Sequence, residues 1–124
     1  EGGNETILLV EDERAILRMT ATMLQGLGYS VIAANSAQRA LQAAQESASP
    51  IDLLLSDIIM PQMNGWDLAN ALAPFQPTMR WLFMSGYTAN VISRQGAITE
   101  GLHFIQKPFS KNDLAAKIRE ALEG

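Results

Sequence analysis

Short apolar runs recur along the chain, separated by longer stretches in which apolar residues return every three or four positions. A continuous apolar run of about four to eight residues, bounded by polar or turn residues, is typical of a strand buried on both faces of a parallel sheet. The runs predict five strands, at Thr6–Val10, Ser30–Ala34, Ile51–Ser56, Met79–Ser85 and Phe104–Ile105.

The stretches between these runs have the period of amphipathic helices. The first ends at Gly28, a common helix stop. Ser36 is a candidate N-cap for the second, and Ser110-x-x-Asp113 resembles a capping box for the last. The predicted helices cover about 16–27, 36–44, 64–72 and 110–122, with a fifth, short helix between Thr88 and Gly101.

Strands and helices therefore alternate from one end of the chain to the other. Right-handed crossovers between such elements favour an α/β fold, with one parallel sheet and helices on both of its faces. Residues 1–5 are polar and glycine-rich, and we interpret them as the remnant of a linker. Residues 6–124 are expected to form one domain.

Composition narrows the possible functions. The 124 residues carry a net charge of −4 and no basic run, which argues against direct nucleic-acid binding. The chain has no cysteine, which excludes disulfides and thiolate metal sites and fits a cytoplasmic location. No apolar stretch approaches the roughly 20 residues that span a bilayer, so we expect no membrane contact by this domain.

Polar residues follow four of the five predicted strands. Glu11 and Asp12 come after the first strand, Asp57 after the third, Ser85 closes the fourth, and Lys107 lies just past the fifth. In a parallel sheet the carboxyl ends of all strands lie along one edge, where ligands bind. These five side chains are therefore expected to converge on one site.

Converging carboxylates need a cation. Two carboxylates about 4 Å apart repel by roughly 4 kcal/mol at an effective dielectric near 20. Oxygen ligands without histidine or cysteine favour Mg²⁺. With the metal and Lys107 in place, Asp57 could act as a nucleophile and form an aspartyl phosphate, while the Ser85 hydroxyl contacts a phosphoryl oxygen. The pattern indicates a magnesium-assisted phosphoryl-acceptor site.

Each of these residues alone has an ordinary explanation. An acid at a strand end is usually a solvated loop residue, and Asp12 could simply cap the first helix. Ser85 could be a turn residue and Lys107 a surface lysine. The single His103 and the indole of Trp66 are interpreted as structural residues. Only the combination of the five residues at one sheet edge favours the phosphoryl-acceptor interpretation.

Other functions fit less well. A phosphatase with an aspartyl-phosphate intermediate needs a second acid two residues after the nucleophile, where this chain has Ile59. A flavin or nucleotide module needs a glycine-rich or hydroxyl-rich loop after the first strand, where the sequence reads Glu11-Asp-Glu-Arg14. An interaction module that works without phosphorylation is a further alternative. As an isolated domain the chain is not expected to be an enzyme beyond self-phosphorylation and slow autodephosphorylation.

The motifs resemble the receiver domain of two-component response regulators over essentially the whole chain, from Thr6 to Leu122. The resemblance implies a flavodoxin-like, doubly wound sheet of five parallel strands in the order 2-1-3-4-5, with five helices. The segments that carry it are Ile7-Leu-Leu-Val-Glu-Asp-Glu13, Leu53-Leu-Leu-Ser-Asp-Ile-Ile-Met-Pro61 with Asn64-Gly65, Phe83-Met-Ser-Gly86, and Phe104-Ile-Gln-Lys-Pro-Phe109.

The resemblance implies a role for each matching residue. Asp57 is the expected phosphoacceptor, and Mg²⁺ is expected on Asp12, Asp57 and the Ile59 carbonyl, with Glu11 acting through water. Lys107 would bind the phosphoryl group, the Lys107–Pro108 peptide bond is expected to be cis, and Pro108 is expected to be part of the switch. Ser85 matches the switch hydroxyl and Phe104 the switch aromatic, which turns inward once the hydroxyl moves. Ile59 and Tyr87 border the path of attacking water.

Two residues depart from the common pattern of such domains. Phe104 has no hydroxyl where many relatives carry Tyr, so a readout there must work by burial. Ser85 replaces the commoner Thr and lacks a methyl group that would restrict its rotamer. The wording of Phe83–Thr88 and Gln106–Ser110 is most similar to receivers at the C-terminal end of hybrid sensor histidine kinases. The expected partner is a histidine kinase or a histidine phosphotransfer domain, while the sequence leaves the oligomeric state and the output open.

Overall fold

The computed structural model describes residues 3–61, 63–85 and 103–123. Its sheet contains β1 (Thr6–Val10), β2 (Ser30–Ala34), β3 (Leu53–Asp57), β4 (Arg80–Ser85) and β5 (His103–Gln106). All neighbouring strands are parallel, in the order β2-β1-β3-β4-β5. The predicted flavodoxin-like strand order is therefore confirmed.

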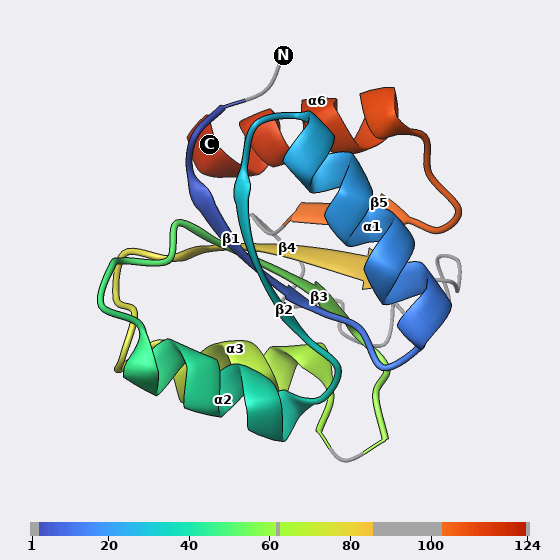
Figure 1. Ribbon diagram of the computed structural model, residues 1–124. Helices are drawn as coiled ribbons and strands as arrows, with labels where there is room; N and C mark the ends of the chain where they lie inside the picture. Colours follow the sequence, from blue (N-terminus) through green and yellow to red (C-terminus); the bar gives the residue numbers. More distant parts are fainter. Residues whose placement is uncertain (1–2, 62, 86–102, 124) are drawn as a thin grey trace.

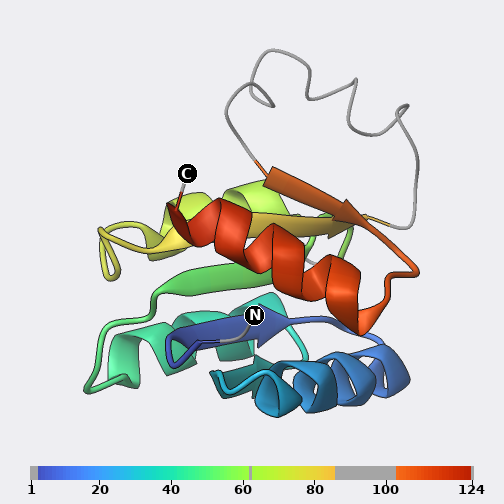
Figure 2. The ribbon, with the colours of Figure 1, turned by 90° about the horizontal axis from the view of Figure 1, so that it is seen from above.

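Helices cover both faces of this sheet. Figure 1 shows α1 (Arg14–Gly26) and α6 (Lys111–Glu123) on one face, and α2 (Ala37–Glu46) and α3 (Gly65–Leu72) on the other. Seen from above, α6 lies across β4 and β5 (Figure 2). The fifth helix expected between Thr88 and Gly101 lies outside the described residues.

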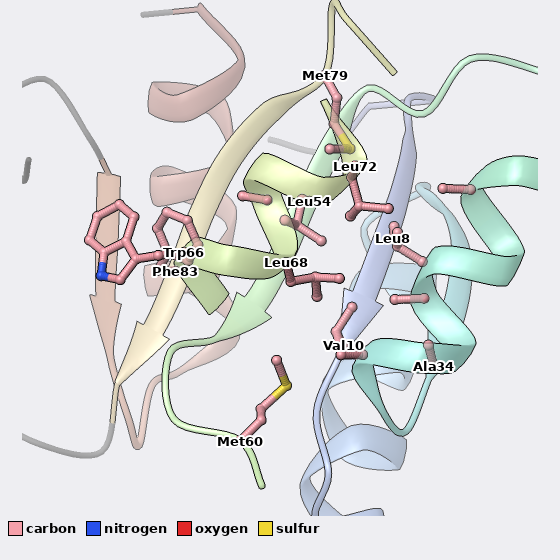
Figure 3. Close-up of a cluster of buried hydrophobic side chains, with 14 of the residues drawn as sticks. Leu8, Val10, Ala34, Leu54, Met60, Trp66, Leu68, Leu72, Met79 and Phe83 are labelled. Carbon is pink, nitrogen blue, oxygen red and sulfur yellow. The ribbon is translucent and has the colours of Figure 1, made fainter. Parts of the chain in front are cut away.

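The alternation of side chains along β1 shows why the sequences of the strands are continuously apolar. Ile7 and Leu9 pack in the cluster beneath α1 and α6, while Leu8 and Val10 pack in the cluster beneath α2 and α3 (Figure 3). Successive side chains of a strand point to opposite faces, so a strand covered on both sides must be apolar at every position.

Polar side chains fix the beginnings of three helices. The Ser36 hydroxyl accepts a hydrogen bond from the Arg39 N–H at 3.2 Å, and the Asn64 side chain accepts one from Asp67. Ser110 and Asp113 exchange hydrogen bonds in both directions, which confirms the capping box. The N-cap of α1 is Glu13, without a side-chain capping bond, so Asp12 does not cap that helix.

The predicted boundaries differ by a few residues from those of the structure. The third strand was expected from Ile51 and begins at Leu53, and the Ile51 N–H donates to the side chain of Gln76 at 2.9 Å. At its other end, the strand includes Asp57 as its last residue. The phosphoacceptor candidate is therefore held by the sheet itself.

The residues before β1 also contact the domain. The Glu5 carboxylate accepts two hydrogen bonds from Arg119 on α6, both at 3.1 Å, and the Gly3 N–H donates to the Leu27 carbonyl. The division between a linker and a domain at Thr6 stays a prediction. Among the described residues, no helix is long and apolar enough to cross a membrane.

Candidate metal and phosphoacceptor site

Three carboxylates converge at the carboxyl edge of the sheet, as expected. Glu11 and Asp12 directly follow β1, and Asp57 ends the adjacent β3, where Val10 and Ser56 are register partners. One carboxylate oxygen from each of the three acids lies within 4.8 Å of the others. Glu11 is fully buried, Asp57 is 8% exposed, and Asp12 is open to solvent. The cluster thus has a buried floor and one exposed carboxylate.

Lys107 reaches this cluster from the β5 side of the sheet. Its ammonium nitrogen lies 2.8 Å from a Glu11 oxygen and 3.3 Å from an Asp57 oxygen. Burial alone would lower the pKa of Lys107, but the hydrogen bonds and negative charges of Glu11 and Asp57 outweigh it and raise that pKa. The lysine therefore stays charged. The Lys107–Pro108 peptide bond is cis, as the resemblance implied.

Asp57 holds its charge less readily. Burial, followed by the negative charge of Glu11, raises the pKa of Asp57 to about 6, and the nearby Lys107 only partly opposes this. Three carboxylates face one ammonium group, so a site with all groups ionised has an excess of negative charge. A bound dication would supply the missing positive charge. The all-oxygen donor set and the raised pKa of Asp57 both fit Mg²⁺.

The other predicted site residues lie around this cluster. Ser85 is the last residue of β4 and is 3% exposed; it lies one residue beyond Met84, the register partner of Asp57. Ile59 lies two residues past Asp57, and its side chain is 48% exposed. Only its backbone carbonyl could bind a metal, and that role stays a prediction. Gly86 and Tyr87 lie outside the described residues.

Phe104 and Pro108 lie on the β5 side of the site. Phe104 is half-buried in β5, as the register partner of Phe83, and Pro108 is exposed in the segment that follows. His103 lies 3.7 Å from Glu120 of α6 and does not belong to the acidic cluster. The structure therefore places no histidine of the described residues among the three acids.

One residue that supports the site was missed as a functional position. Gly65 was interpreted as part of a helix start and of the motif that carries the resemblance, with no role at the site, yet a Cβ atom there would lie 2.6 Å from the Asp57 carbonyl oxygen. Its N–H also donates to the Ile58 carbonyl at 2.7 Å. Helix α3 therefore begins directly against the backbone that carries Asp57. Only a glycine in the first turn of a helix hinted at this close approach.

Fold and site together define a class of protein. The family model for the response regulator receiver domain matches residues 7–119, and the chain belongs to this family. Its expected likeness to receivers of hybrid sensor kinases is also confirmed. It is 36% identical over 121 residues to the sensor kinase CckA of Brucella abortus, an alignment that covers 98% of this chain and 13% of the kinase.

A relative of about the same length and two solved structures are also similar to this chain. The response regulator receiver protein CpdR of Brucella abortus is 31% identical over 94% of this chain and 95% of its own length. Among solved structures, the receiver domain of the hybrid histidine kinase CckA has a TM-score of 0.79 at 35% identity, covering 94% of this chain and 98% of that one. The Vibrio cholerae chemotaxis protein CheY4 has a TM-score of 0.84 at 25% identity, covering 97% and 100%.

Proposed function

We propose that this receiver domain accepts a phosphoryl group from a phosphohistidine onto Asp57 in a Mg²⁺-dependent reaction, and that the phosphoryl group then changes its conformation. The observation that carries the proposal is the meeting of Glu11, Asp12 and Asp57 within 4.8 Å, with Lys107 at 3.3 Å from Asp57. The acid proposed as acceptor thus lies at one edge of the sheet with two acids that could bind a metal and with a cation suited to phosphoryl oxygens.

The transfer breaks the phosphorus–nitrogen bond of the donor and forms a phosphorus–oxygen bond to Asp57. The leaving imidazole nitrogen keeps the bonding electron pair and is protonated afterwards. Bound Mg²⁺ would neutralise charge on the acids and on the phosphoryl oxygens. Glu11, Asp12, Asp57 and the Ile59 carbonyl would hold it. Asp57 must be ionised to attack, and its pKa of about 6 leaves it ionised at neutral pH.

Lys107 and Ser85 would contact the transferred group. Lys107 is a mobile point charge at the end of a flexible stem, and it suits an oxygen of the phosphoryl group. Ser85, at the end of β4, would donate its hydroxyl to another. Phe104 would then turn inward toward the space that the hydroxyl leaves. Without a phenolic hydroxyl, Phe104 can report this change only through its burial.

The donor histidine must come from another domain or protein. His103 is the single histidine of the chain, and it faces Glu120 rather than the acids. A histidine kinase or a histidine phosphotransfer domain is the proposed partner. The chain spans 13% of the sensor kinase that it resembles. We propose that it is part of a hybrid kinase and that it lies in the cytoplasm.

Intact-protein mass after incubation with acetyl phosphate tests the function. We expect a single phosphoryl adduct that requires Mg²⁺ and is absent in Asp57→Asn. Asp67→Asn is the matched control, because Asp67 is an exposed aspartate on α3, and its adduct should equal that of the wild type. An equal adduct on Asp57→Asn would overturn the assignment of the acceptor. No adduct under any condition would favour an interaction module that works without phosphorylation.

A further inference from the structure

Trp66 joins the start of α3 to the edge strand β5. Its side chain is 5% exposed, and its ring centroid lies 4.6 Å from that of Phe83 and 5.8 Å from that of Phe104. Phe83 and Phe104 are themselves 6.0 Å apart. Figure 3 shows the indole of Trp66 beside Phe83 of β4. Three rings from α3, β4 and β5 thus form one closed triangle.

The residue before Trp66 ties this triangle to the phosphoacceptor. Gly65 has no room for a side chain, because a Cβ atom would lie 2.6 Å from the Asp57 carbonyl oxygen and 3.1 Å from the ring of Phe83. Its N–H bonds the Ile58 carbonyl at 2.7 Å. Closely packed interiors transmit displacement rather than absorb it. A shift of the backbone around Asp57 must therefore move the first turn of α3, and Trp66 with it.

The indole nitrogen is the one polar atom in this triangle of rings. Its Nε1–H is buried and has no hydrogen-bond partner in the described part of the chain. A buried donor without an acceptor is unfavourable, so a rearrangement that brings an acceptor or water to it gains free energy. Phe104, on the other side of the contact, is only half-buried, and it lines a surface pocket together with Ser85 and Phe109.

We propose that Trp66 is a positioning residue that sets the place of Phe104 according to the charge on Asp57. It does so through the packed path Asp57, Gly65, Trp66, Phe104, which does not pass through the Ser85 hydroxyl. The inference rests on the proposed phosphorylation of Asp57 and adds a second connection between the acceptor and β5. Phosphorylation of Asp57 would thus change the position of Phe104 at the other end of the path, so the two residues would be energetically coupled.

The two tryptophans of the chain supply a matched pair of probes. Trp81→Phe leaves Trp66, which contacts both Phe83 and Phe104. Trp66→Phe leaves Trp81, whose ring lies 6.1 Å from Phe83 and forms no ring pair with Phe104 in the described residues. On phosphorylation with acetyl phosphate and Mg²⁺, the fractional change in Trp66 emission should exceed that of Trp81 by about twofold or more. Adding Phe104→Ala to the Trp81→Phe variant should at least halve the fractional change in Trp66 emission.

A second readout separates coupling from simple packing. Trp66→Leu and Phe104→Ala should each change the fraction of adduct at limiting acetyl phosphate, and the double variant should change it by less than the product of the two factors. Circular dichroism checks that each variant is folded. The proposal is overturned if the two factors multiply, or if Trp66 emission stays constant while intact mass shows a full adduct. Absence of the adduct itself would instead count against the phosphorylation of Asp57.

Discussion

The ammonium group of Lys107 donates a 2.8 Å hydrogen bond to the carboxylate of Glu11, although the two residues are 96 positions apart in the chain. Glu11 is fully buried, so this ion pair forms the floor of the acidic site. The lysine lies 0.5 Å closer to Glu11 (2.8 Å) than to Asp57 (3.3 Å). A phosphoryl group on Asp57 would have to draw the ammonium away from its present partner.

Asp57→Asn should stabilise the domain at pH 7 when no divalent cation is present. The pKa of Asp57 is raised from 3.8 to about 6 in the folded state, first by burial and then by Glu11. Between these values the folded state binds more protons than the unfolded state, so stability falls as the pH rises through this window. Removing the charge in Asp57→Asn should therefore raise the free energy of unfolding by roughly 1–3 kcal/mol at pH 7.

Urea unfolding with a chelator at pH 7 and at about pH 3 or lower, well below the ordinary aspartate pKa, measures this effect. The gain should disappear at the lower pH, because Asp57 is protonated in both states there. The exposed Asp67→Asn variant should stay within about 0.5 kcal/mol of the wild type at both pH values. The same gain at both pH values would contradict the raised pKa as its cause.

Mg²⁺ should raise the melting temperature more at pH 7.5 than at pH 5. Binding requires an ionised Asp57, whose pKa is about 6. Below this pH the apparent affinity should fall by about tenfold per pH unit, because each bound ion must displace one proton. Thermal melts across a Mg²⁺ titration at both pH values give the comparison. An equal shift at the two pH values would mean that the ion binds without Asp57.

Gly65→Ala should impair both stability and phosphorylation. The added methyl group would meet the Asp57 carbonyl oxygen at 2.6 Å, and backbone must move to accept it. Overpacking of this kind costs about 1–3 kcal/mol. We also expect a slower rise of the adduct with acetyl phosphate, since the displaced backbone carries the acceptor.

Gly26→Ala provides the control for this change. There the new methyl group would meet only the end of the flexible Lys111 side chain at 2.9 Å, and alanine favours the helix by roughly 1 kcal/mol. Gly26→Ala should therefore leave the rate of phosphorylation unchanged and stability equal or higher. A Gly65→Ala variant that behaves like Gly26→Ala would show that the backbone at Asp57 has more room than the structure gives it.

Ile59→Asn should shorten the lifetime of the phosphorylated state. The Ile59 side chain is 48% exposed, two residues past the acceptor, where it can shield the phosphoryl group from water. An amide there would admit and orient water, and we expect hydrolysis to quicken by about threefold or more. The decay of the adduct by intact mass measures the lifetime, with Ile59→Val as the apolar control. Equal lifetimes for the wild type and the Ile59→Asn variant would defeat the idea.

Thr20→Val should stabilise the domain. The Thr20 hydroxyl on α1 is fully buried and has no hydrogen-bond partner within the described ranges. Replacing it with a methyl group of the same shape removes an unpaired polar group and should gain about 1 kcal/mol in urea unfolding. Thr22→Val is the control, because the exposed Thr22 hydroxyl already bonds the Arg18 carbonyl. That variant should be no more stable than the wild type.

The strands and the meeting of the acids could be predicted because both follow from local pattern and from one rule of topology. Continuous apolar runs fix which segments are buried strands, and parallel strands bring Glu11, Asp12 and Asp57 to the same edge. The side chains that cap α2 and α6 were also predictable, since Ser36, Ser110 and Asp113 act within three residues of their partners.

Contacts between distant segments set the remaining features. No local pattern shows that the side chain of Gln76 accepts a hydrogen bond from the N–H of Ile51, 25 residues away, just before β3. The close approach of Gly65 to the Asp57 carbonyl and the contact of Trp66 with Phe104 likewise depend on how α3 lies on the sheet. A glycine and a tryptophan at a helix start are ordinary in sequence, and only packing gives them a special place.

The distance in sequence between Glu11 and Lys107 also bears on how a newly made chain becomes competent. Translation delivers the acids after β1 and β3 first, and the lysine that balances them arrives only after β5. Domains fold as units during synthesis. A nascent chain that ends before Lys107 therefore has the proposed acceptor without its cation, and on the proposed function we expect capture of a phosphoryl group only after the last strand has joined the sheet.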